Sequence, residues 1–272
     1  MVSHPSGSTP TRTPATAHPS VRRNAVSLTP RLVLATDLDG TFLGGDDQQR
    51  QALYADLNSR GDDLLLIFVT GRDLTFVADL VSQPGMPTPD LIIGDVGTTI
   101  VHGRDHAPVT ELQDWVDERW NGANERVRDL LADEPGLRLQ PVMGQRRVSY
   151  YYDPATLQAS TIAKVEAAGF DVITSADTFL DVLPRGVAKG PTLTRLVAAL
   201  DLPADAVLVA GDTLNDLSLF QTAFRGVAVG NSEPALVERL AGLSDVHHSA
   251  LPGCAGIADA IEHFRFFAPS GA

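Results

Sequence analysis

Short apolar runs alternate with stretches of helical periodicity along most of this chain. The runs LVLAT, LLLIFV and LIIG, the first of which starts at residue 32, are separated by helical stretches at 48–59 and 73–82. After Lys189 the pattern resumes with the runs AVLVA and GVAV and with helical stretches over 189–200, from about 214, near 233–241 and near 256–265. Such alternation is typical of parallel strands that are joined by crossover helices. We therefore expect an α/β fold built on a parallel sheet.

The middle of the chain departs from this pattern. Residues 111–133 place apolar side chains at steps of three and four, as one amphipathic helix or a broken pair of helices does. The runs LRLQP, RRVSYYYD, FDVITS and FLDVLP follow, with one helical stretch at 154–168, and this order is typical of an open α+β sheet. We expect residues 104–184 to form an inserted second domain and residues 30–103 and 185–272 to form the core domain.

The first 29 residues differ in composition from the rest. They are rich in Ser, Thr, Pro and Ala and contain no acidic residue. Such a segment cannot bury enough apolar surface to order itself, so we expect residues 1–29 to be a disordered tail. The composition also resembles an organellar transit peptide, which is the less favoured interpretation.

The charge balance limits the classes of ligand. The chain has 21 Lys plus Arg against 34 Asp plus Glu, a formal net charge of −13. So acidic a protein repels nucleic acids and anionic membrane surfaces unless it has a local basic patch, which the sequence does not supply. No apolar run approaches the roughly 20 residues that span a bilayer. The single cysteine, Cys254, cannot form an internal disulfide. We expect a soluble, cytoplasmic protein that binds neither nucleic acid nor membrane.

Four carboxylates follow the ends of predicted strands. Asp37 and Asp39 come directly after the first apolar run, and residues two apart on an extended segment point the same way. Asp212 and Asp216 follow the run AVLVA, where a helix cap explains one carboxylate but not both. Four carboxylates at one sheet edge repel one another unless cations neutralise them. An all-oxygen site of this kind suits Mg²⁺.

Two further segments carry candidate anion-binding groups. Thr70 and Gly71 stand between a predicted strand and a helix, where they form either an anion cradle or an ordinary capped turn. Lys189 stands at the start of another predicted helix. A lysine is usually a solvated surface charge, but this chain uses arginine nineteen times and lysine twice. A retained lysine at this joint therefore indicates a need for a compact ammonium group.

These four segments, in this order, resemble the motifs of the haloacid dehalogenase superfamily of phosphotransferases. The resemblance implies a Rossmann-like core in which Asp37 attacks phosphorus and forms an aspartyl-phosphate. It implies that Asp39 protonates the departing alcohol oxygen and then activates water. Thr70, Gly71 and Lys189 would hold the phosphoryl oxygens and the charge of the nucleophile.

The same resemblance implies a metal site. Asp37, the backbone carbonyl of Asp39 and Asp212 would ligate Mg²⁺, and Asp216 would be a further ligand or a partner that orients the ligands. A non-catalytic scaffold that accompanies a sugar-phosphate synthase is the alternative from another functional class. The presence of the whole residue set argues against that alternative, because a scaffold needs none of it.

The position of the insertion narrows the resemblance. Asp39 and Thr70 are separated by 31 positions, whereas Thr70 and Lys189 are separated by 119. Superfamily members with their cap domain in the second gap (C2-type) have this spacing, and β-phosphoglucomutase-like mutases do not. The stretches TPDLIIGDVGTTIVHG, RRVSYYYD, FLDVLPRGVAKG and GDTLNDLSLF look like those of sucrose-6-phosphate phosphatases and their relatives, over about residues 31–265.

The expected activity is therefore hydrolysis of a small-molecule sugar phosphate. A phosphorylated disaccharide or glycoside similar to sucrose 6-phosphate is the first candidate substrate. The relatives leave other substrates open: mannosyl-3-phosphoglycerate, trehalose 6-phosphate, glucosylglycerol phosphate and pseudo-disaccharide phosphates. The shared core motifs do not separate them, because the core contacts only the phosphate.

Five residues are candidate substrate contacts. By resemblance, Gly97 and Thr98 would lie at the entrance to the cap, near the sugar. On the predicted strand from Arg147, alternation places Arg147 and Ser149 on the less apolar face, where they contact either the sugar or solvent. Asn215, within the last motif, is the fifth candidate.

Overall fold

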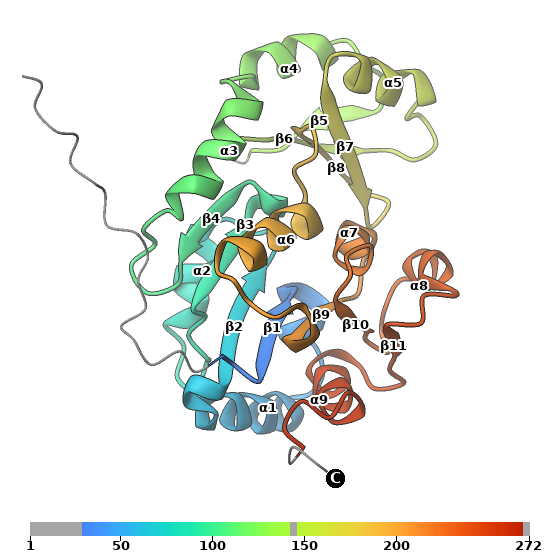
Figure 1. The fold of residues 1–272 in the computed structure, drawn as a ribbon. Coiled ribbons are helices and arrows are strands. Elements are labelled where there is room, and N and C mark those ends of the chain that lie inside the picture. Colours follow the sequence, from blue (N-terminus) through green and yellow to red (C-terminus); the bar gives the residue numbers. More distant parts are fainter. Residues whose placement is uncertain (1–28, 142–145, 269–272) are drawn as a thin grey trace, which may run out of the picture.

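Two β-sheets organise the chain in the computed structural model, which describes residues 29–141 and 146–268 (Figure 1). The larger sheet has the strand order β11-β10-β9-β1-β2-β3-β4, and each neighbouring pair is parallel except β3 and β4. Its strands are β1 (Leu32–Thr36), β2 (Leu64–Val69), β3 (Leu91–Gly94), β4 (Thr99–His102), β9 (Val207–Gly211), β10 (Arg225–Ala228) and β11 (Val246–His248). The expected α/β class is confirmed. The predicted tail at residues 1–29 lies, apart from Thr29, outside the described residues.

Helices cover both faces of the larger sheet. Alternate residues of β1 enter different apolar clusters: Leu32 and Leu34 pack with α1, α2 and α9, whereas Val33 and Ala35 pack with α6, α7 and α8. These helices are α1 (Asp47–Ser59), α2 (Leu74–Val81), α6 (Lys189–Ala199), α7 (Leu217–Phe220), α8 (Pro234–Leu240) and α9 (Gly253–His263). We refer to the larger sheet with these helices as the core.

The smaller sheet lies at the opposite end of the molecule from α1 and α9 (Figure 1). Its strands, in the order β5-β6-β8-β7, are all antiparallel: β5 (Leu137–Leu139), β6 (Val148–Tyr152), β8 (Phe179–Pro184) and β7 (Phe170–Ser175). The helices α4 (Asn124–Leu131) and α5 (Ala159–Ala167) pack on one face of this sheet. We refer to the smaller sheet with α4 and α5 as the cap.

Helix α3 (Thr110–Trp120) connects the two parts. Its residues Leu112 and Val116 belong to an apolar cluster of the core, and Trp120 belongs to that of the cap. The strands of the smaller sheet lie within residues 104–184, the range predicted for the inserted domain. The boundaries of that domain stay a prediction, since α3 shares its apolar side chains between both clusters.

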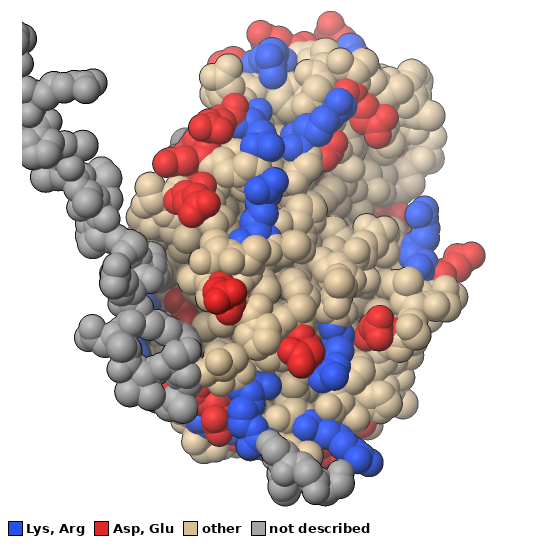
Figure 2. Space-filling view, in the orientation of Figure 1, with Lys and Arg blue, Asp and Glu red and all other residues tan. Residues whose placement is uncertain are grey.

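Two observations concern the expectation that the protein binds neither nucleic acid nor membrane. On the face shown in Figure 2, Lys and Arg side chains are interspersed with Asp and Glu side chains. In the part of the chain that the structure describes, no helix combines the length and the apolar character that crossing a membrane requires.

Candidate functional site

A cavity of about 640 Å³ lies between the cap and the edge of the larger sheet where the parallel strands end. Its core side is lined by residues that follow β1, β2 and β9, among them Asp37, Gly71 and Asp212. Its cap side is lined by residues of the smaller sheet, among them Arg147 and Phe179. The carboxyl edge of a parallel sheet is where ligands bind in such folds.

Lys189 does not line the cavity itself but contacts two residues that do, Asp37 and Asn215. Its side chain is fully buried, and Nζ donates to Asp37 Oδ1 at 2.7 Å, Asp216 Oδ1 at 2.6 Å and Asn215 Oδ1 at 2.7 Å. An ammonium group has three protons to donate, so these partners use all of them. Lys189 is therefore not a solvated surface charge. It ties the end of β1 to the turn that follows β9.

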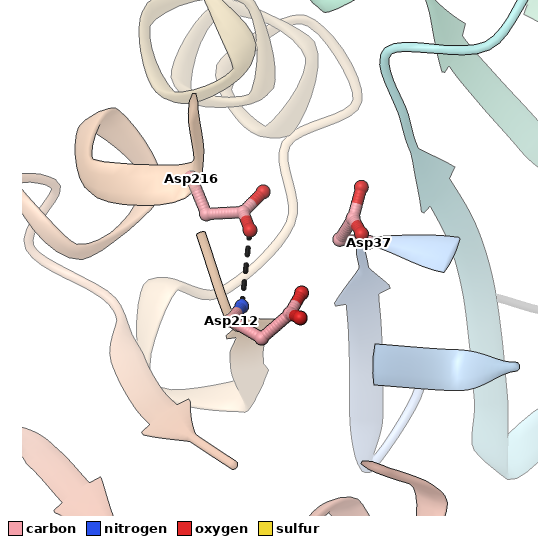
Figure 3. Close-up of side chains that lie close together, drawn as sticks. All are labelled: Asp37, Asp212 and Asp216. Atoms are coloured by element: carbon pink, nitrogen blue, oxygen red, sulfur yellow. Dashed lines mark hydrogen bonds between the residues drawn. The ribbon is translucent and has the colours of Figure 1, made fainter. Parts of the chain in front are cut away.

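Three carboxylates converge beside this lysine. Asp37, Asp212 and Asp216 are all buried, and one ligand atom from each lies within 4.8 Å of the others. Figure 3 shows the carboxylate of Asp37 facing those of Asp212 and Asp216. Carboxylate oxygens packed this closely need positive charge beyond that of one ammonium group.

The pKa values show the same shortage of positive charge. Burial raises the pKa of Asp37 well above its usual range, although Lys189 opposes the rise. Burial and the nearby charge of Asp216 raise the pKa of Asp212 to about 7. Burial alone would lower the pKa of Lys189, but the charges of Asp216 and Asp37 outweigh it and raise the value. The cluster thus favours the binding of a cation.

The donors fit Mg²⁺, with unequal parts for the carboxylates. Asp216 Oδ2 accepts the backbone N–H of Asp212 at 3.0 Å (Figure 3). It also accepts the backbone N–H of Thr213 at 3.1 Å, and Asp216 Oδ1 accepts from Lys189. Because its oxygens already serve protein donors, Asp216 fits the part of an orienting partner better than that of a ligand. Asp212 accepts from the neutral side chains of Thr41 at 2.9 Å and Asn231 at 3.4 Å, so Asp37 and Asp212 are the better candidates for direct donors to a hard divalent cation.

The backbone after β1 approaches Asp212 closely. Gly40 has φ +77°, and a Cβ at this position would lie 2.1 Å from Asp212 Oδ2. A side chain here would therefore fill the space beside the carboxylate. Thr41 Oγ1 donates to Asp212 Oδ1 at 2.9 Å. These contacts bring the segment that carries the Asp39 carbonyl next to the carboxylate cluster.

Asp39 faces a different partner from Asp37. The Nε and Nη2 atoms of Arg72 each donate to one oxygen of the Asp39 carboxylate at 2.8 Å, and both side chains are half exposed. The guanidinium lies 4.5 Å from the ring centroid of Phe76. Sequence reasoning did not include Arg72. Its position directly after Thr70 and Gly71 was the available signal, since it follows a strand at the same sheet edge as the carboxylates.

Thr70 and Gly71 have separate environments. Thr70 is fully buried, and its Oγ1 accepts the backbone N–H of Arg72 at 3.1 Å, whereas Gly71 lines the cavity. The Thr70 hydroxyl therefore shapes the turn that presents Gly71 and Arg72 to the cavity.

Among the candidate substrate contacts, Arg147 and Asn215 line the cavity. Arg147 pairs with Asp95 of the core at 3.0 Å and with Asp181 of the cap at 3.2 Å. Ser149 is not among the lining residues; it is buried and donates to Asp181. Asp95 and Asp181 were not candidates from the sequence.

Gly97 and Thr98 also lie away from the cavity lining. Gly97 has φ +107°, and a Cβ there would lie 2.5 Å from the backbone carbon of Ala188. Its carbonyl accepts the hydroxyl of Thr192 at 2.9 Å, and the carbonyl of Thr98 accepts the side chain of Gln113 at 3.1 Å. These two residues pack the β3–β4 turn against the start of α6, and their expected place near the sugar stays a prediction.

Comparisons with known proteins match this arrangement. The model of a family described as sucrose-6F-phosphate phosphohydrolase matches residues 30–265. A glucosylglycerol-phosphate synthase of Pseudomonas anguilliseptica is 43% identical over 243 residues, which make up 88% of this chain and 32% of that protein. Sucrose-phosphatase 1 of Nicotiana tabacum is 34% identical over 256 residues, 86% of this chain and 59% of that protein. The chain thus spans from a third to three fifths of these two relatives.

Two further matches extend over nearly the whole relative. The mannosylfructose-phosphate phosphatase of Agrobacterium fabrum is 29% identical over 246 residues, 86% of this chain and 97% of that protein. The crystal structure of a Synechocystis sucrose-phosphatase in complex with sucrose and phosphate superimposes with a TM-score of 0.80 and 28% identity. That match covers 88% of this chain and 100% of the other.

Proposed function

The chain belongs to the sucrose-6F-phosphate phosphohydrolase family, and from this premise we propose that it is a Mg²⁺-dependent phosphomonoesterase acting on a phosphorylated disaccharide or glycoside. One observation carries the proposal. The buried carboxylate of Asp37 is held by Lys189 beside Asp212, at a cavity that core and cap line together. A scaffold protein has no need of this assembly.

In the proposed reaction Asp37 is the nucleophile. Its Oδ1 accepts from Lys189, so Oδ2 is the oxygen that forms the bond to phosphorus. The bond from phosphorus to the sugar oxygen breaks, and Asp39 gives a proton to that oxygen. Water then attacks phosphorus, Asp39 takes a proton from it, and phosphate leaves as Asp37 is regenerated.

The neighbouring residues hold these groups in place. Lys189 fixes the Asp37 carboxylate, and Arg72 holds the Asp39 carboxylate at the cavity. Asp39 gives up one of its two hydrogen bonds from Arg72 when it carries the proton that it delivers to the sugar oxygen. Gly71 offers backbone at the cavity for the phosphoryl oxygens, as a turn before a helix does. When bound by Asp37, Asp212 and the Asp39 carbonyl, Mg²⁺ supplies positive charge that offsets the carboxylates and the phosphoryl oxygens.

Two substrates have specific support. The family model, and the relative crystallised with sucrose and phosphate, favour sucrose 6-phosphate. The 43% identity to a protein named glucosylglycerol-phosphate synthase favours glucosylglycerol phosphate as the second candidate. Both leaving groups are uncharged glycosides. Mannosylfructose phosphate and the other sugar phosphates considered above complete the set to be tested.

A substrate screen tests the activity. Phosphate release is measured from sucrose 6-phosphate, glucosylglycerol phosphate, trehalose 6-phosphate, mannosylfructose phosphate and mannosyl-3-phosphoglycerate, with Mg²⁺ and with EDTA. We expect kcat/KM for one glycoside phosphate to exceed the others by more than about tenfold, and EDTA to abolish release. No hydrolysis of any glycoside phosphate in the presence of Mg²⁺ would refute the proposal.

The Asp39→Asn variant tests the mechanism. Rapid-quench labelling with a ³²P-labelled substrate should show an aspartyl-phosphate that breaks down more slowly than in the wild type, because no base activates the water. An unchanged breakdown rate would remove Asp39 from this role.

A further inference from the structure

The residues that line the cap side of the cavity differ in kind from those of the core side. Its wall consists of Gln140, Arg147, Ser175, Ala176, Phe179 and Asp181, which we call the cap-side wall. The β7–β8 hairpin brings part of this wall against the turn Leu214–Asp216 of the core. The wall therefore faces the space that the alcohol part of a bound phosphate ester occupies under the proposed function.

Phe179 is the apolar member of this wall. Its side chain is 38% exposed, although it is a large aromatic residue. Tyr151 stands opposite it on β6 with its ring centroid 5.9 Å away, and Arg138 lies 4.3 Å from the Tyr151 ring. These neighbours hold one edge of the Phe179 ring in place. An aromatic face left open in a polar cavity gains free energy when a ligand with an apolar face covers it.

The charges of the wall are balanced among themselves. Among the described residues of this wall, Arg147 carries the positive charge, and its guanidinium is shared between Asp95 and Asp181. Its side chain is 8% exposed. Two carboxylates around one guanidinium leave no excess positive charge. A carboxylate on the ligand would meet net negative charge here, whereas hydroxyl groups would meet the polar groups of Gln140, Ser175 and Asp181.

Under the proposed function the cap-side wall contacts the leaving group, and we propose that Phe179 packs against the pyranose ring of this group and that the wall selects neutral glycosides over glycosides that carry a carboxylate. This inference rests on the proposed function and specifies its substrate class. A pyranose ring has one face made of C–H groups and a rim of hydroxyl groups. The exposed ring of Phe179 and the surrounding polar side chains complement these two features.

The first test replaces the aromatic ring. Phe179→Ala, Phe179→Tyr and the wild type are compared on the preferred glycoside phosphate and on acetyl phosphate, which has no sugar. For Phe179→Ala we expect kcat/KM on the glycoside phosphate to fall about 10- to 100-fold, mainly through KM, and that on acetyl phosphate to change less than about 3-fold. Phe179→Tyr keeps the ring face and should stay within about 3-fold of the wild type on both.

Leu139→Ala is the matched control. Leu139 lies on the same sheet and is 46% exposed, but it does not line the cavity. Its replacement should leave both substrates unaffected. An equal loss on both substrates in Phe179→Ala would assign Phe179 a structural role and overturn the inference, while wild-type hydrolysis of the glycoside phosphate would keep the proposed function. A wild type that hydrolyses acetyl phosphate alone would overturn both.

The second test changes the charge of the leaving group. Glucosylglycerol phosphate and mannosyl-3-phosphoglycerate are similar in size, but only the second leaves behind a carboxylate. We expect the wild type to favour the neutral member by more than about tenfold in kcat/KM. Asp181→Asn removes one negative charge beside Arg147 and should narrow that ratio. Equal rates on both in the wild type, or a ratio that Asp181→Asn does not change, would contradict the charge selection.

Discussion

The two sides of the cavity use their charged residues in opposite ways. On the core side, Lys189 is fully buried and three carboxylates converge beside it, so that further positive charge is needed. On the cap side, Arg147 is already balanced by two carboxylates, and a partly exposed aromatic ring stands next to it. Under the proposed function, the core side serves the phosphoryl group and a cation and the cap side serves the uncharged leaving group, so that chemistry and selectivity would lie on different parts of the molecule.

Under the proposed function, this difference would allow related phosphatases to keep one kind of core while they act on esters with different leaving groups. Transfer of a phosphoryl group to a carboxylate admits few arrangements of nucleophile, ammonium group and metal ligands. Contact with a sugar admits many, because hydroxyl groups and ring faces accept varied partners.

Asp37→Asn removes the nucleophile from the core side and leaves the cap-side wall intact. We expect turnover to fall by roughly 10⁴-fold or more, because no carboxylate remains to attack phosphorus. Binding of the glycoside phosphate should persist in the presence of Mg²⁺, since the cap contacts are unchanged. Phosphate release gives the first quantity and calorimetric titration the second. Phe179→Ala should show the reverse pattern, with weaker binding and nearly normal chemistry on acetyl phosphate. Retained hydrolysis by Asp37→Asn would contradict the assignment.

Lys189→Met tests the buried ammonium group. The substitution leaves Asp37 and Asp216 buried without their partner, and breaking a buried ion pair in this way costs about 3–5 kcal/mol. We expect the urea midpoint in EDTA to fall accordingly and Mg²⁺ to restore part of it, because a bound cation stabilises the folded state. Lys189→Arg keeps the charge but places a planar group among three converging acceptors, so it should also lose activity. A wild-type midpoint in Lys189→Met together with wild-type activity in Lys189→Arg would show that the ammonium group is dispensable.

The core could be predicted well from the sequence, because the signals for it lie within short segments of the chain. Alternating apolar runs predicted a parallel sheet, and motif positions at strand ends predicted which side chains meet. Asp37 and Asp39 both line the cavity, as their spacing predicted, but they pair with different residues, Lys189 and Arg72. The spacing could not predict these partners, because β1 ends at Thr36 and the helical turn Leu38–Phe42 begins between the two carboxylates.

The cap-side wall could not be predicted in the same way. Ser149 and Asp181 are cross-strand neighbours, and Arg147 meets Asp95 across the two domains, at separations that no short motif encodes. Strand alternation also predicted that Val148, Tyr150 and Tyr152 share the more apolar face of that strand; the first two are buried in the cap and Tyr152 is partly buried. Strand alternation could not predict which residues Arg147 and Ser149 contact, because those contacts depend on the order of the strands and on how the cap lies against the core.

The pair between Arg147 and Asp95 joins cap to core and tests how strongly the two sides are coupled. A double-mutant cycle with Arg147→Met and Asp95→Asn, measured by urea unfolding, should give a coupling free energy of about 1–3 kcal/mol, because the pair is largely buried. The matched control is the more exposed pair of Arg146 and Asp117, for which we expect less than about 1 kcal/mol. Equal coupling free energies in the two cycles would mean that burial at the cavity does not strengthen the ion pair.

The smallest effect is expected at the chain's other lysine, on the outer surface of the cap. Lys164 is 46% exposed and pairs with Glu134 at 2.8 Å, so Lys164→Met should cost less than about 1 kcal/mol and leave kcat unchanged. Hydrogen bonds from Lys164 and Thr161 lower the pKa of Glu134 below its ordinary 4.5. A lowered carboxyl pKa contributes stability above the unfolded value and loses it as pH falls through the folded value. The difference between wild type and Lys164→Met, followed by urea unfolding, should therefore be largest above about pH 5 and shrink in more acidic solution. If Lys164→Met lost as much free energy of unfolding as Lys189→Met, or if its loss grew as the pH fell, the two lysines would not differ as proposed. Lys189 would then have no special role at the phosphoryl site compared with the surface ion pair of Lys164.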